Sequence, residues 1–88
     1  PLEVENFLAL TRLRLLAEAR GVVSITEDLM YLQIAFAQPG IDYDAKALRN
    51  LPFRAETTQY PPGFRIHKKG LRPEEYLQAI SEVLYLVG

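Results

Sequence analysis

The stretch FRAETTQYPPGFRIHKK, residues 53–69, decides the expected fold. Here the helical spacing of apolar residues gives way to the period of two that is typical of strands. The two halves of the stretch, residues 53–60 and 64–69, have the composition of strands, and Pro61-Pro62-Gly63 between them is typical of a turn. A Pro-Gly pair suits the centre of a type II turn, which fits a two-residue hairpin poorly, so we expect a longer loop. The stretch therefore predicts an antiparallel two-stranded hairpin.

The second strand of this hairpin alternates between apolar and basic side chains. Phe64 and Ile66 are expected on one face, and Arg65, His67 and Lys69 on the other. This division follows from the period of two and does not depend on the register of the hairpin. The strand is thus expected to turn an apolar face to the core and a basic face to solvent.

Apolar residues at helical spacing predict four helices outside the hairpin. The second has the clearest start, because Ser24 and Glu27 have the spacing of a capping box. Pro39-Gly40 is expected to end that helix. The four predicted helices cover about residues 4–19, 24–38, 42–50 and 73–86.

The expected fold class is α+β and α-rich, with three helices, a two-stranded hairpin and a C-terminal helix. The length of 88 residues predicts a single domain, 1–88. The order of elements can be compared with that of a winged-helix domain, although no sequence motif supports the comparison. Asp42 and Asp44, at the start of the third predicted helix, argue against a reader of the DNA major groove, because phosphate would repel them.

Composition excludes several classes of protein and site. The chain has no cysteine and one histidine, which excludes thiolate metal sites and a pair of histidine ligands within one chain. His67 has no serine at a supporting spacing, because Ser24 is assigned to a helix start and Ser81 to the interior of the last helix. We therefore expect no catalytic residue, no metal, no cofactor and no enzymatic activity. The absence of a long apolar run predicts no membrane segment, and the composition suggests a cytoplasmic protein.

Charge is distributed unevenly although the net charge is −1. Residues 46–72 hold seven basic residues and one acidic residue, whereas acidic residues predominate in residues 1–45 and 73–88. A basic segment of this kind attracts polyanions, such as nucleic acid or an acidic protein. The alternative is an edge that prevents strand-to-strand aggregation or balances the acidic helices. The candidate polyanion-binding residues are Arg54, Arg65, His67, Lys68, Lys69 and Arg72.

Apolar residues lie on more than one side of three predicted helices, whereas a surface helix normally has one apolar stripe. In the first helix, one stripe contains Val4, Phe7, Leu8, Thr11 and Leu15, and a second stripe lies on the far side. This excess predicts a homo-oligomer, most simply a twofold dimer. The candidate interface residues are Leu10, Leu13, Leu16, Tyr76, Ile80, Leu84 and Val87.

Two functions are consistent with these patterns. The first is a small non-enzymatic binding module that presents the basic hairpin, residues 53–72, to nucleic acid or another polyanion. The second is a structural or adaptor protein that binds protein partners through the apolar faces of the N- and C-terminal helices. The first depends on free basic side chains and the second on apolar side chains left exposed by the fold.

Overall fold

The structure is a computed structural model that describes the backbone of residues 2–88 and the side chains of residues 8–88. The strands come in two pairs along the chain, separated by a helix. The order of elements is α1 (Leu2–Ala19), β1 (Val22–Glu27), β2 (Tyr31–Phe36), α2 (Ala45–Arg49), β3 (Ala55–Gln59), β4 (Pro62–His67), the short 3₁₀ helix η1 (Pro73–Glu75) and α3 (Tyr76–Leu84).

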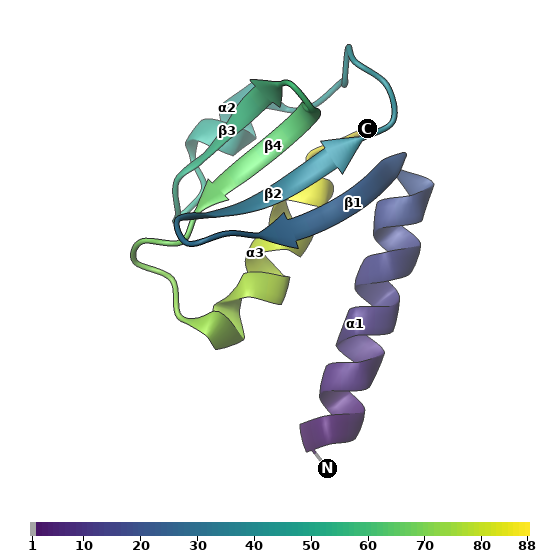
Figure 1. The fold of residues 1–88 in the computed structure, drawn as a ribbon, viewed down its shortest axis with the longest axis vertical. Coiled ribbons are helices and arrows are strands. Elements are labelled where there is room, and N and C mark those ends of the chain that lie inside the picture. Colours follow the sequence, from purple (N-terminus) through teal and green to yellow (C-terminus); the bar gives the residue numbers. More distant parts are fainter. Residues whose placement is uncertain (1) are drawn as a thin grey trace.

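The four strands form one antiparallel sheet in the order β1-β2-β4-β3. The helix α3 packs against the central strands β2 and β4, α1 packs beside β1 and α3, and α2 packs beside β3. The sheet face opposite α1 and α3, which we call the open face, has no helix over it (Figure 1). The N-terminal half of α1 extends beyond the rest of the molecule (Figure 1).

The core lies between the sheet and α3. Strand alternation explains its composition, because every second residue of β2 and β4 points to the helices. In β4, Phe64 and Ile66 are fully buried, and their β2 partners Ile34 and Leu32 are buried beside them. From α3, the residues Ala79, Ile80, Val83 and Leu84 complete this core.

The prediction of an α-rich fold with a single hairpin is wrong, because residues 24–38 form no helix. They contain β1, a tight turn and β2 instead. Ser24 and Glu27 are strand residues and do not form a capping box. Asp28 closes the turn, and its Oδ1 accepts hydrogen bonds from the backbone N–H groups of Met30 and Tyr31.

The physical reason for this error is the side-chain chemistry of the segment. The β1 sequence VVSITE is rich in β-branched residues, which favour strands. In β2 the buried residues Leu32, Ile34 and Phe36 recur every second position. The same residues also fit a helical stripe, and the extended conformation prevails because it buries them against α3.

The other predicted elements are present with adjusted bounds. The predicted hairpin at residues 53–69 is the β3–β4 pair, but the expectation of a longer loop is wrong, because Gln59 pairs with Pro62 and only Tyr60 and Pro61 lie between them. The third predicted helix is reduced to α2, which starts after the N-cap Asp44. None of the helices among residues 2–88 combines the length and apolar content that crossing a bilayer requires.

Candidate functional site

A polar cluster occupies the centre of the open face. Glu56 of β3 accepts hydrogen bonds through both carboxylate oxygens, from Arg65 Nη2 at 2.7 Å and from His67 Nε2 at 2.5 Å. The Glu56–Arg65 contact is set by the register, which places the two residues opposite each other. Tyr31 of β2 completes the cluster, with the Arg65 guanidinium carbon 4.8 Å from its ring centre and the His67 ring edge-on at 4.9 Å.

Hydrogen bonds from His67 and Arg65 lower the pKa of Glu56 from 4.5 to about 2. The same carboxylate raises the pKa of Arg65. Because Glu56 has a depressed pKa in the folded state, its charge stabilises the fold fully above pH 4.5. That contribution is lost as the pH falls from 4.5 towards 2.

Replacing Glu56 with glutamine is therefore expected to reduce the free energy of unfolding at pH 7 by about 1–2 kcal/mol, a value reduced for solvent screening of a partly exposed group. The difference between wild type and Glu56→Gln should shrink as the pH falls from 4.5 to 2. Urea denaturation at pH 7 and pH 3 measures both quantities. Glu18→Gln is the control, because Glu18 is exposed and has no ion pair among the described residues. Equal pH dependence in Glu56→Gln and wild type would contradict the assignment.

Most of the predicted polyanion-binding residues have acidic partners within the chain. Lys68 Nζ lies 2.6 Å from Glu27 Oε2 and also donates to the Asp28 carbonyl oxygen. Arg72 lies 3.4 Å from Glu74 and 3.5 Å from Glu75. Together with the Arg65 and His67 contacts described above, these pairs neutralise much of the positive charge of the hairpin.

Two of the predicted polyanion-binding residues, Arg54 and Lys69, have no side-chain ion pair within the described part of the chain. They lie at the same end of the sheet, because the Arg54 carbonyl accepts a hydrogen bond from the His67 N–H and Lys69 follows two residues later. The structure thus places five of the six candidates on or next to the β3–β4 hairpin and Arg72 before η1, and it leaves Arg54 and Lys69 as uncompensated cations. Pairing across strands depends on the register, which the spacing of charges along the chain does not reveal.

The predicted interface residues have different surroundings from one another. In α3 and at the chain end, Ile80, Leu84 and Val87 are buried in the core of the single chain, and Tyr76 is half-buried. In α1, Leu13 is buried, Leu16 is half-buried and Leu10 is exposed. The second predicted stripe of α1 therefore faces the chain's own body.

Of the first predicted stripe of α1, Leu8, Thr11 and Leu15 are exposed, whereas the side chains of Val4 and Phe7 lie outside the described residues. Leu8 is 47% exposed and Leu15 is 63% exposed. They are separated by seven residues and so lie two turns apart on the same side of the helix. We call this pair the α1 stripe. The sequence indicated two apolar sides of α1 but did not show which one packs inward.

The surroundings of α1 also include an apolar groove of about 470 Å³, which lies between α1, β1 and α3. It arises because α1 diverges from β1 and its N-terminal half lies beyond the sheet (Figure 1). Its lining is mostly aliphatic and includes Leu10, Leu13, Val22, Ile25, Leu77 and Ile80. The groove and the α1 stripe lie on different sides of the same helix.

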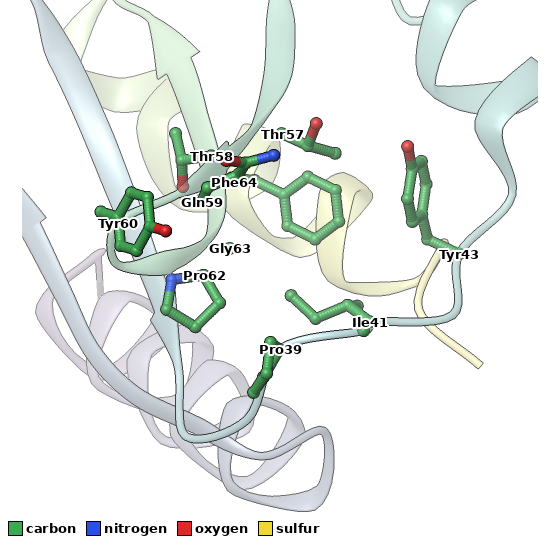
Figure 2. A pocket seen from close by; sticks show the side chains of 11 residues that line it. Pro39, Ile41, Tyr43, Thr57, Thr58, Gln59, Tyr60, Pro62, Gly63 and Phe64 are labelled. Carbon is green, nitrogen blue, oxygen red and sulfur yellow. The ribbon is translucent and has the colours of Figure 1, made fainter.

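A pocket of about 510 Å³ lies at the opposite side of the sheet, next to the edge strand β3. Phe64 forms its floor, with Tyr43 and Ile41 on one side and Thr57 above (Figure 2). Tyr43 meets the Phe64 ring edge-on at 5.4 Å. The lining contains no charged side chain among the described residues, so the pocket suits neutral groups.

Candidate metal ligands are dispersed in the described part of the chain. Residues 8–88 contain no cluster of three or more His, Cys, Asp or Glu side chains that could hold a metal ion. The Ser81 hydroxyl donates to the Leu77 carbonyl, and the Asp44 carboxylate caps α2. These groups therefore have structural partners.

Comparison with known proteins gave no relative, since no protein-family model, no curated protein and no solved structure matches the chain.

Proposed function

We propose that this chain is a non-enzymatic structural or adaptor domain that forms a twofold dimer through α1. The observation that carries the proposal is the exposure of the α1 stripe, Leu8 and Leu15, on a helix whose other side is already packed. Leu13 and Ala17 anchor α1 to the body of the chain. The helix is thereby held in place while its opposite side presents apolar surface to solvent.

The spacing of the exposed side supports pairing with another helix. Leu8, Thr11 and Leu15 are separated by three and four positions, which is the spacing of a coiled-coil seam. In an antiparallel twofold pair, Leu8 of one copy would lie near Leu15 of the other. One surface then serves both partners, as a twofold interface requires.

The dimer proposal is tested by sedimentation equilibrium over a range of protein concentrations. Leu15→Glu is expected to weaken dimerisation by at least about 100-fold, because the twofold axis brings two buried carboxylates into one interface. Leu8→Glu should have the same effect. Circular dichroism should show both variants folded, since neither side chain is buried.

The matched control is Leu29→Glu, which makes the same chemical change at a leucine that is 92% exposed in the β1–β2 turn. This control should leave dimerisation unchanged. A wild-type protein that is monomeric at about 100 μM, a concentration at which even weak specific interfaces form, would overturn the proposal. Equal dimerisation of Leu15→Glu and wild type would overturn it too.

Polyanion binding is a second candidate, supported by the uncompensated cations Arg54 and Lys69. It has weaker support than dimerisation, because Arg65, His67, Lys68 and Arg72 are engaged by carboxylates. With two free cations, the affinity for an oligonucleotide should depend only weakly on salt, with a log–log slope of about −2. A steeper slope would favour this candidate, since it would require the internal ion pairs to open.

A further inference from the structure

The edge of β3 carries backbone groups without a partner. The His67 N–H donates to the Arg54 carbonyl, which identifies Arg54–His67 as a hydrogen-bonded pair. In an antiparallel ladder such pairs alternate, so Glu56 and Thr58 also bond to β4, through Arg65 and Gly63. The backbone N–H and C=O groups of the residues between them, including Thr57, therefore point away from the sheet.

This free edge lies directly beside the Phe64 pocket. The Thr57 side chain is on the core side of the sheet, because Thr57 pairs with the buried Phe64. It lines the pocket together with Ile41 and Tyr43 (Figure 2). The hydrogen-bonding edge of β3 and the uncharged Phe64 pocket thus form one continuous surface.

We propose that this surface binds an extended peptide segment of a partner protein, which adds a fifth strand to β3. The peptide backbone would pair with Ala55, Thr57 and Gln59, the residues whose backbone groups face outward. Cross-strand neighbours share a face, so the peptide residue opposite Thr57 would place its side chain into the pocket. Because the lining carries no charge, that side chain should be neutral and apolar.

The other sheet edge is less suited to this role. The ladder of β1 is irregular between Val22 and Ser24, and a bulge interrupts strand addition. The helix beside β1, α1, has 18 residues, whereas the helix beside β3, α2, has only five (Figure 1). The groove next to β1 lies between this strand, α1 and α3, and α1 forms one of its walls.

The proposal is tested by NMR titration of the protein with a blocked peptide of alternating valine and threonine and one central leucine. The largest amide shift changes are expected at Ala55, Thr57 and Gln59. Two control peptides separate the contributions. One is N-methylated at alternate amides, which removes its backbone donors, and the other has glutamate in place of the central leucine. Both should bind at least about tenfold more weakly, the loss expected when edge hydrogen bonds or pocket burial are removed.

Variants of the protein test the same surface from the other side. Thr57→Pro removes an outward N–H without removing a ladder bond, a change that edge strands tolerate. It should reduce affinity for the leucine peptide at least about tenfold, whereas Thr57→Val should retain binding. Ile41→Glu should also reduce the affinity for the leucine peptide, because it places a charge in the pocket. This variant provides a second test if Thr57→Pro unfolds.

Three results would overturn the proposal: no shift changes at millimolar peptide, largest changes at β1 amides, or equal binding by the N-methylated peptide. The outcome is independent of dimerisation, because the α1 stripe lies at the other side of the sheet. Leu15→Glu should therefore bind the leucine peptide as wild type does.

Discussion

Gly63→Ala is expected to reduce the free energy of unfolding by about 3–5 kcal/mol, a large fraction of the total for a domain of this size. Gly63 lies in β4 with φ +155, a conformation that side chains disfavour. A Cβ atom at this position would lie 1.9 Å from the Ile34 carbonyl oxygen. That oxygen belongs to the neighbouring central strand, so relief of the clash would separate β2 from β4.

Urea denaturation measures the effect, and Gly40→Ala separates its two causes. Gly40 also has a positive φ, +74, but nothing lies within 4 Å of an added Cβ. Gly40→Ala should therefore cost about 1 kcal/mol from backbone strain alone. A Gly63→Ala variant that loses no more stability than Gly40→Ala would show that β2 and β4 do not approach each other as described.

The sequence predicted the elements whose ends carry strong local signals. The helix α1 ends before Gly21, which has a positive φ, and α2, predicted over residues 42–50, starts after Asp44, whose side chain accepts from the Ala47 N–H. The β3–β4 hairpin was recognisable from its alternation and its prolines. In each of these cases a local interaction decides the conformation, so the residues themselves reveal it.

The β1–β2 hairpin could not be recognised in the same way. Its turn contains neither glycine nor proline, and Asp28 closes it by a side-chain contact. Ile25, Leu32 and Phe36 fit a helical stripe as well as a strand, because short apolar segments satisfy both periods. What decides between them is burial against α3, which lies about 50 residues further along the chain.

The candidate sites show the same limit. The sequence shows the basic residues as a regional excess, but it does not show that Glu56, the one acidic residue among them, contacts two of them. Its contacts with Arg65 and His67 require the β3–β4 register, and the Lys68–Glu27 contact joins segments 41 residues apart. Likewise, two stripes of α1 had similar apolar content, and the position of α3 determines which one is covered. Tertiary arrangement, and not local chemistry, therefore selects the exposed surfaces.

The two proposed surfaces lie at opposite sides of one sheet. The α1 stripe is carried by α1, which packs beside the edge strand β1. The peptide site is on β3, the other edge strand. A twofold dimer formed through α1 would therefore carry two peptide sites facing away from its axis. Two linked sites bind a divalent partner more tightly than one site does, which is a physical advantage of an adaptor of this form.

Phe64→Ala is expected to reduce the free energy of unfolding by about 3–5 kcal/mol. Phe64 has no exposed surface and sits on β4 at the centre of the sheet. It also makes edge-to-face contacts with Phe36 at 5.8 Å and with Tyr43 at 5.4 Å. Truncation removes both aromatic contacts and leaves a cavity that the surrounding strands cannot close. Thermal and urea denaturation, followed by circular dichroism, measure the loss.

Phe64→Leu and Tyr60→Ala define the scale of this effect. The leucine variant keeps most of the apolar volume and should lose about 1–2 kcal/mol, so it stays folded if the alanine variant does not. Tyr60 is 94% exposed at the adjacent turn, and its truncation should change stability by less than about 0.5 kcal/mol. Because Phe64 is buried directly beneath the peptide pocket and packs against Tyr43 of its lining, Phe64→Leu should alter the pocket and weaken binding of the leucine peptide. Similar stability losses in Phe64→Ala and Tyr60→Ala would contradict the burial of Phe64 and, with it, the floor of the proposed site.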